Sequence, residues 1–276
     1  MFLISTASFY FWESHYDPVT CLDLIGKLDL QHVDGCDIYI DPNRCRHFVT
    51  NISTENKALL AGFVFNTLHT DLLSFEWKTP FDDNELKAVL VELESVRAAI
   101  DTDSVVIHGD FFYQDAKKRL ALIREYLPNA EMHLEMMGSD KQFATNPAHM
   151  LNLLSVDSEI FITPDIAHMQ DWKTQFSWKD IFEDPVLKER IKIVHASHHT
   201  QHLKNNWYID NGYEECDEAV HSLLQCDPEA FNEQDDHAYF NGKVVVLEGI
   251  LPVSININEL IKTEIRLITR HPEFTT

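Results

Sequence analysis

The sequence predicts an α/β fold, a (β/α)8 barrel that forms a single domain over residues 1–276. Eight short apolar runs alternate with longer stretches of helical period, as expected for a parallel sheet with helical crossovers. No Pro- or Ser-rich linker divides the chain, and its 276 residues suit a barrel, which typically uses about 250. A doubly wound open sheet is the alternative, because a strand count from one sequence easily errs by one or two.

The eight predicted strands are the short apolar runs. They are Phe2–Phe9, Cys36–Ile40, Phe63–Leu68, Ser104–His108, Glu131–Met136, Ile160–Ile166, Lys192–Ala196 and Lys243–Glu248. The interval from His195 to Glu248 is longer than one crossover helix requires. We therefore expect an extended insertion between strands seven and eight.

Four of the intervening stretches carry helix signals. Asp83–Ile100 and Gln114–Leu127 place apolar residues at steps of three and four, and Pro128 ends the second. Asn146-Pro147 supplies an N-cap and a first-turn proline for a helix through Leu154. Asn258–Thr269 stacks isoleucines on one face, which predicts the last helix of the barrel.

Composition restricts the partners of the chain. Its 22 Lys and Arg against 45 Asp and Glu give a net charge of −23, which disfavours nucleic acid as a partner. No apolar run approaches the roughly 18 residues of a membrane span. The five cysteines are odd in number and lack CxxC spacing, which favours a reducing compartment. We expect a cytoplasmic protein that acts on a small molecule.

Six of the predicted strands end in histidine or acidic residues. The C-terminal ends of barrel strands meet at one mouth, where catalytic residues lie. Imidazole and carboxylate are ligands for zinc, manganese or iron. The sequence therefore predicts one or two divalent metal ions. Their predicted ligands are His69, His108, Glu135, Asp165, His168, His195 and Glu248.

Each of these residues also has a simpler interpretation. His69 or His108 alone would be a hydrogen-bonded core histidine, and Asp165 alone would be a helix cap. Glu135 and Glu248 are different, because each follows an apolar strand and an unpaired carboxylate is costly to bury. The coincidence at six strand ends favours the metal site.

The order of these residues resembles the xylose isomerase-like TIM-barrel superfamily, which contains sugar isomerases and epimerases and zinc-dependent apurinic endonucleases. The most specific pieces are Asp165-Ile166-Ala167-His168 and Leu247-Glu248-Gly249. Likeness to the single-metal epimerases implies one metal and a substrate contact from His168. The four ligands would then be Glu135, Asp165, His195 and Glu248.

Likeness to the endonucleases implies two metals that share Glu135. His69 and His108 would join Glu135 on the first metal. The ligands of the second would be Glu135, Asp165, His195 and Glu248. A third zinc in those endonucleases needs an Asp-x-His pair soon after strand seven, where this chain has Asp210-Asn211-Gly212.

The function that we expect is isomerisation or epimerisation of a sugar or sugar phosphate through a metal-stabilised enediolate. Glu135 and Glu248 would be the acid and base, and His168 would assist. A binuclear phosphodiesterase or other hydrolase is one alternative, and an iron-dependent modifying enzyme on the same ligands is another. A scaffold that has lost its chemistry is disfavoured, because all six strand-end positions are intact.

The roles of two further groups that contain histidine stay open. His198, His199 and His202 follow strand seven and would complete a metal shell, shuttle protons or lie in a solvated loop. Asp235-Asp236-His237 has the Asp-x-His form but lies shortly before strand eight, where a solvated acidic turn is the simpler interpretation.

Overall fold

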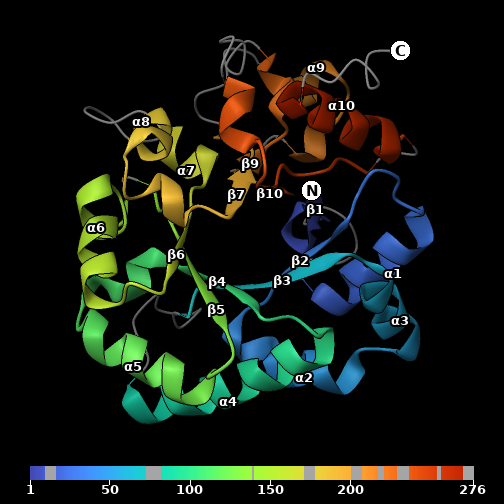
Figure 1. Ribbon diagram of the computed structural model, residues 1–276. Helices are drawn as coiled ribbons and strands as arrows, with labels where there is room; N and C mark the ends of the chain where they lie inside the picture. The colour runs from blue at the N-terminus through green and yellow to red at the C-terminus, as the bar shows by residue number, and fades with distance from the viewer. Residues whose placement is uncertain are drawn as a thin grey trace.

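The computed structural model describes residues 1–9, 17–72, 82–138, 140–170, 178–199, 207–216, 221–228, 236–253 and 256–269. Eight strands pair in parallel in the order β6-β5-β4-β3-β2-β1-β10-β7. They form a ring with helices outside it (Figure 1). The strands are β1 (Phe2–Ser5), β2 (Gly35–Tyr39), β3 (Phe65–Thr70), β4 (Ser104–His108), β5 (Glu131–Glu135), β6 (Phe161–Thr163), β7 (Ile193–Ala196) and β10 (Val244–Leu247).

The ring closes between β6 and β7 by two isolated parallel bridges. These bridges join Ile162 to Ile191 and Asp165 to His195, whereas the seven other strand pairs form regular ladders. The predicted (β/α)8 barrel is therefore confirmed, and the open doubly wound sheet is wrong.

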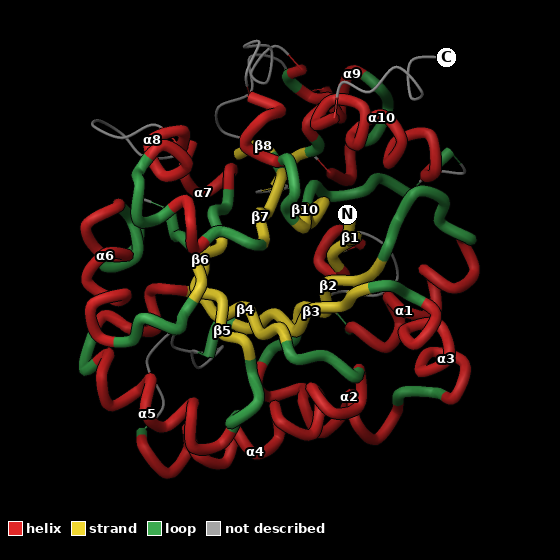
Figure 2. Tube along the Cα trace, viewed as in Figure 1, coloured by secondary structure: helices red, strands yellow, loops and turns green. Residues whose placement is uncertain are grey.

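Helices surround the strands, as Figure 2 shows in red and yellow. The four helices expected from periodicity are present, with ends that differ by a few residues at most. The helices are α1 (Pro18–Leu28), α2 (Cys45–Asn51), α3 (Thr54–Gly62), α4 (Asp83–Ile100), α5 (Ala116–Tyr126), α6 (Pro147–Val156), α7 (Ile166–Gln170), α8 (Trp178–Glu183), α9 (Trp207–Asp210) and α10 (Ile257–Thr269).

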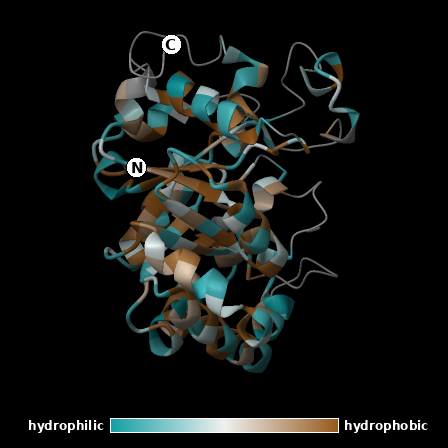
Figure 3. Ribbon diagram, turned by 90° about the vertical axis from the view of Figure 1, so that its right-hand side faces the viewer, coloured by the Kyte–Doolittle hydropathy of each residue, from teal (hydrophilic) through white to brown (hydrophobic). Residues whose placement is uncertain are grey.

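Two hydrophobic clusters follow from the alternation of side chains along each strand. Outward-facing strand residues pack with the helices in the larger cluster. A separate cluster of Leu3, Val106, Ile193 and Val246 fills the inside of the ring. Figure 3 shows the strands at the middle of the molecule, coloured mainly as hydrophobic. Many of the buried polar residues lie near the C-terminal ends of the strands, whereas Asp37 lies in the middle of β2.

Two predicted strands were too long by more than two residues. The run Phe2–Phe9 is a strand only to Ser5, and Thr6–Phe9 form a 3-10 helix. The run Ile160–Ile166 is a strand only over Phe161–Thr163. Pro164 has no N–H to continue the ladder, and the Asp165 side chain accepts a hydrogen bond from the His168 N–H, which begins α7.

The predicted insertion lies between β7 and β10. Its described parts are α9, three 3-10 helices and a two-stranded antiparallel sheet of β8 (His198–His199) and β9 (His221–Ser222). Among the described residues, no helix combines the length and apolar character that a bilayer crossing requires.

Candidate metal centre

The predicted ligands meet at one mouth of the barrel. Neighbouring parallel strands end at the same level, so His108 lies opposite Glu135 and Asp165 lies opposite His195. The ion-pair distances link seven side chains into one group. They are His69, His108, Glu135, Asp165, His168, His195 and Glu248.

Glu135 lies at the centre of this group, and its two carboxylate oxygens face different imidazoles. Oε2 lies 2.7 Å from Nε2 of His69 and 3.5 Å from Nε2 of His108. Oε1 lies 3.8 Å from Nδ1 of His195 and 3.6 Å from Nε2 of His168. The ligand atoms of His69, His108 and Glu135 all lie within 4.8 Å of one another, so these residues form a first possible cation site.

His195 belongs to a second possible cation site. Its Nδ1 lies 3.3 Å from Oε2 of Glu248 and 3.9 Å from Oδ2 of Asp165. Glu135, Asp165 and His195 also have ligand atoms within 4.8 Å of one another. The two sites therefore adjoin at Glu135.

Burial and charge set the protonation of this centre. Burial alone would raise the pKa of the Glu135 carboxyl, but the imidazoles of His108, His69 and His195 lower it. Burial alone would lower the pKa of His195, but Glu248 and Glu135 raise it to about 9. Burial lowers the pKa of His108 to about 3, against the charge of Glu135, which raises it, and with the charge of His69, which lowers it further. His108 is therefore neutral at pH 7, with a lone pair available to a metal.

The donor atoms suit divalent cations. Buried atoms that lack a hydrogen bond include Oδ2 of Asp165, Oε2 of Glu248 and both ring nitrogens of His195. Buried polar atoms without partners are costly, and a cation among them would satisfy them. Imidazole and carboxylate together are a ligand set for zinc, manganese or iron.

A third group contains His221, which the sequence had not singled out. β9 brings this imidazole beside His168, with ring centroids 5.0 Å apart. Its Nδ1 lies 2.9 Å from Oγ of Ser197 and 3.8 Å from Oε2 of Glu248. Asp165, His168 and His221 have ligand atoms within 4.8 Å of one another. His221 lies in the long insertion, where no periodicity indicates the direction of a side chain.

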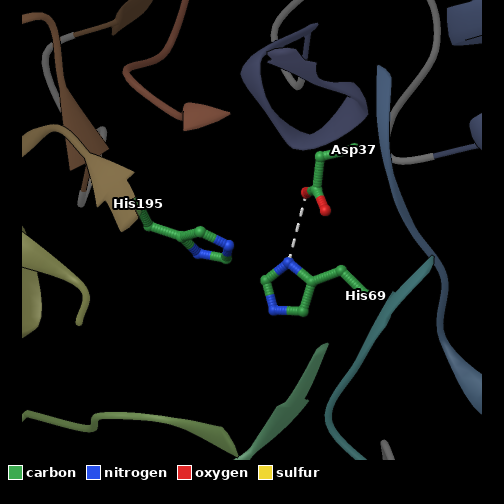
Figure 4. A group of neighbouring side chains, drawn as sticks. All are labelled: Asp37, His69 and His195. Carbon is green, nitrogen blue, oxygen red and sulfur yellow. Dashed lines mark hydrogen bonds and ion pairs between the residues drawn. The ribbon is translucent and has the colours of Figure 1, made fainter. Parts of the chain in front are cut away.

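Asp37 is the second residue that the sequence reasoning missed. It is fully buried on β2, and Figure 4 shows it facing His69, with His195 beside both. Burial alone would raise the pKa of Asp37, but the charge of His69 and their hydrogen bond lower it. The available signal was an acid inside the predicted apolar strand Cys36–Ile40, the same kind of signal that singled out Glu135.

Two glycines allow the site to pack closely. Gly109 follows His108, and a Cβ there would lie 2.5 Å from the carbonyl oxygen of Glu135. Gly249 follows Glu248, and a Cβ there would lie 2.7 Å from Cα of Leu223. Only glycine lets the backbone approach this closely.

The other insertion histidines do not join the candidate cation sites of the described chain. Nε2 of His198 lies 3.1 Å from the carbonyl oxygen of Leu224 and 3.0 Å from that of Asp227, so this imidazole ties parts of the insertion together. The backbone N–H of His199 donates to Gln170. His202, Asp235 and the side chain of His237 lie outside the residues that the structure describes.

Comparison with solved structures identifies the fold. A xylose isomerase-like TIM barrel protein from Mycobacterium smegmatis in complex with magnesium superposes with a TM-score of 0.53 at 10% identity, over 91% of this chain and 88% of that one. The chain has the xylose isomerase-like TIM-barrel fold. The resemblance noted in the sequence is thus confirmed for the fold.

Two other solved structures that superpose on this chain carry the names of different enzymes. A putative sugar phosphate isomerase/epimerase from Anabaena variabilis has a TM-score of 0.62 at 12% identity and covers 98% of both chains. Endonuclease IV from Thermus thermophilus has a TM-score of 0.54 at 14% identity, over 98% of this chain and 99% of that one. No protein-family model and no curated protein matches the sequence. The geometry of the site must therefore decide between reactions.

Proposed function

We propose that this chain is a single-domain metal-dependent enzyme that holds two divalent cations and hydrolyses an ester bond in a small, oxygen-rich substrate. One observation carries the proposal: the two carboxylate oxygens of Glu135 face separate sets of ligands. A carboxylate placed in this way can bridge two metal ions. A protein with one cation would leave the neighbouring imidazoles of His69 and His108 without a part in the chemistry.

The two cations would have different ligand sets. Paired divalent cations about 3.5–4 Å apart activate water and stabilise the negative charge that develops on an ester oxygen. The first would lie between Nε2 of His69, Nε2 of His108 and Oε2 of Glu135. The second would lie between Oε1 of Glu135, Oδ2 of Asp165, Nδ1 of His195 and Oε2 of Glu248.

The side chains at the mouth would have two roles, metal ligation and proton transfer. The lowered pKa values of Glu135 and Glu248 suit metal ligands better than an acid and base at carbon, whose pKa values should lie near the working pH. His168 is 19% exposed at its side chain, whereas Glu135 beside it is 1% exposed. We assign His168 to proton transfer at the leaving group, because it alone of this pair can meet a substrate.

Net charge limits the substrate. A chain with a net charge of −23 repels a polynucleotide backbone. A sugar or polyol ester, including a phosphate ester, carries less charge and fits a barrel mouth. We therefore assign a small molecule as substrate and not nucleic acid.

Isomerisation or epimerisation of a sugar is the second candidate, and a specific observation favours it. Glu135, Asp165, His195 and Glu248 form a complete four-ligand set without help from His69 or His108. A single cation there would hold neighbouring oxygens of a polyol, as the resemblance to single-metal epimerases implies. The structural likeness to the putative sugar phosphate isomerase/epimerase from Anabaena variabilis also supports this second candidate.

Metal content separates the two candidates. Protein purified without chelator should hold two metal ions per chain by plasma mass spectrometry, which also identifies zinc, manganese or iron. His69→Ala should lower the content by one ion and abolish turnover if the centre is binuclear. His133→Gln, which changes a buried imidazole that faces Glu131 on the same barrel, should keep both ions.

Activity assays complete the test. Hydrolysis of a generic phosphomonoester or phosphodiester by the metal-loaded chain supports the proposal. One ion per chain, with deuterium exchange into ketoses and no ester hydrolysis, would establish the isomerase instead. Iron as the only metal, with neither activity, would indicate the iron-dependent modifying enzyme.

A further inference from the structure

Asp37 has no part in the two cation sites, yet its carboxylate is held in one orientation at their edge. Oγ of Ser5 donates to Oδ2 at 3.0 Å, and Oγ1 of Thr67 donates to Oδ1 at 2.5 Å. Nδ1 of His69 lies 3.3 Å from Oδ2. These contacts come from β1 and β3, the two strands that flank β2. A buried carboxylate supported on both oxygens is well placed to accept a third hydrogen bond.

The two nitrogens of His69 therefore face different partners. Nδ1 faces Asp37, whereas Nε2 lies 2.7 Å from Oε2 of Glu135 and 3.1 Å from Nε2 of His108. A neutral imidazole carries its one proton on one nitrogen and has a lone pair on the other. A proton held on Nδ1 by Asp37 leaves the lone pair of Nε2 directed at the first cation site.

A cation beside Asp37 is the competing interpretation. Asp37, His69 and His195 have ligand atoms within 4.8 Å of one another, and Figure 4 shows the three side chains around a common space. A cation there would take Nδ1 of His69 while the first site takes Nε2. The ring would then have to lose both protons, which a carboxylate acceptor does not require.

We propose that Asp37 is a positioning residue that keeps the proton of His69 on Nδ1 and so directs Nε2 at the cation shared with His108 and Glu135. The inference rests on the proposed function for the presence of that cation. Outer carboxylates that accept from a ligating histidine fix its orientation and raise its basicity, and their loss typically weakens metal binding by about 10- to 100-fold. Ser5 and Thr67 support the carboxylate in turn.

Metal titration of the metal-free chain tests this role. Asp37→Asn keeps the shape of the side chain and removes its charge. It should weaken binding of the first cation by about 10- to 100-fold, with the second cation bound as in the wild type. Asp34→Asn is the matched control, because Asp34 accepts the N–H of Phe2 just before β2 and contacts none of the metal ligands. If Asp37 only stabilised the fold, Asp37→Asn would behave like Asp34→Asn. Both substitutions would lower the melting temperature and leave metal affinity unchanged.

Nitrogen NMR of the zinc-loaded wild type gives a second readout that needs no variant. We expect zinc on Nε2 of His69 and a hydrogen-bonded proton on Nδ1. Zinc on Nδ1, or a third zinc that Asp37→Asn removes, overturns the inference in favour of a cation beside Asp37. Unchanged affinity in Asp37→Asn overturns it as well. In each of these cases the wild type still binds metal, so the proposed function stands. A wild type that binds no divalent metal defeats both.

Discussion

Five carboxylates are buried among the described residues, and their surroundings divide them into two kinds. Four lie at the barrel mouth among imidazoles: Asp37, Glu135, Asp165 and Glu248. The fifth, Glu264 on α10, faces no imidazole and accepts hydrogen bonds from the backbone N–H groups of Leu224 and Gln225 at 2.5 and 3.0 Å. Burial raises the pKa of Glu264 to about 7. The same type of side chain thus lies among imidazoles at the mouth and links α10 to the insertion elsewhere.

Glu264 should make the stability of the fold depend on pH. Its pKa is about 7 in the folded chain against an ordinary 4.5, so the folded state holds the proton more tightly than the unfolded state. The stabilisation is complete below about pH 4.5 and is lost as pH rises to about 7. The loss amounts to roughly 3 kcal/mol. The free energy of unfolding of the wild type minus that of Glu264→Gln should therefore fall between pH 5 and pH 8.

Urea denaturation of metal-free protein measures this difference, because the other titrating groups cancel between the two chains. Glu259→Gln, which changes an exposed acid on the same helix, should show no such trend relative to the wild type. A flat difference for Glu264→Gln would mean that the two backbone hydrogen bonds offset the cost of burying its charge.

Side chains at strand ends were predictable, whereas partners from distant segments were not. Glu135 and Glu248 stood out because each follows an apolar strand. Asp37 stands inside such a strand, and the sequence did not show that hydroxyls from Ser5 and Thr67 would satisfy it. His221 reaches His168 only because β9 folds back beside β8, and no local pattern encodes that contact.

The segments that follow β4 and β10 depend on glycine. A Cβ at Gly249 would lie 2.7 Å from Cα and 2.8 Å from the backbone nitrogen of Leu223, which follows β9. Gly249→Ala should destabilise the fold by about 1–3 kcal/mol, because the added methyl group meets backbone and not a flexible side chain. It should also weaken metal binding, because Glu248 is the preceding residue. Thermal denaturation and metal titration of the same variant measure the two effects.

Gly62→Ala is the control for this substitution. Nothing lies within 4 Å of a Cβ at Gly62 in α3, so alanine there should leave stability unchanged or raise it slightly. Equal melting temperatures and metal affinities for Gly249→Ala and the wild type would show that the segment after β9 yields without moving Glu248.

Element positions were predicted well where periodicity and caps agree. Asp83–Ile100 was predicted with its observed bounds, and Asn146 caps α6 as expected by accepting from the His149 N–H. The boundary failed after Ser5, where the predicted run Phe2–Phe9 continues past the strand. Thr6–Phe9, with the sequence Thr-Ala-Ser-Phe, turns into a 3-10 helix whose Thr6 hydroxyl accepts from the Tyr39 N–H. That contact belongs to the assembled barrel and has no local signal.

At the scale of the whole molecule, the net negative charge should disfavour nucleic acid as a partner. Short double-stranded DNA should not bind the metal-loaded chain at physiological ionic strength, because a net charge of −23 repels phosphates beyond the reach of the two proposed cations. Fluorescence anisotropy of labelled DNA measures this, with the metal-free chain as control. Tight, salt-dependent binding would show that the positive charge of the metal centre outweighs the net negative charge of the chain. Nucleic acid would then be a candidate substrate again.

The barrel architecture followed from the alternation of short apolar runs with helical stretches, which is a property of the whole chain. The closure of the ring between β6 and β7 did not follow from it, because no sequence pattern reports which strands meet last. The candidate metal centre was predictable as a set of residues at strand ends, and the likeness to the endonucleases already implied two sites that share Glu135. The three-dimensional distances added that the two carboxylate oxygens of Glu135 face different imidazoles.

The weakest join in the ring has a consequence for assembly. β6 and β7 meet through two isolated bridges, one of which pairs Asp165 with His195. Both residues belong to the second proposed cation site, so an ion there would hold β6 and β7 together as well as face the substrate. Metal binding and closure of the barrel would then be coupled. Without metal, the chain would unfold first between these two strands.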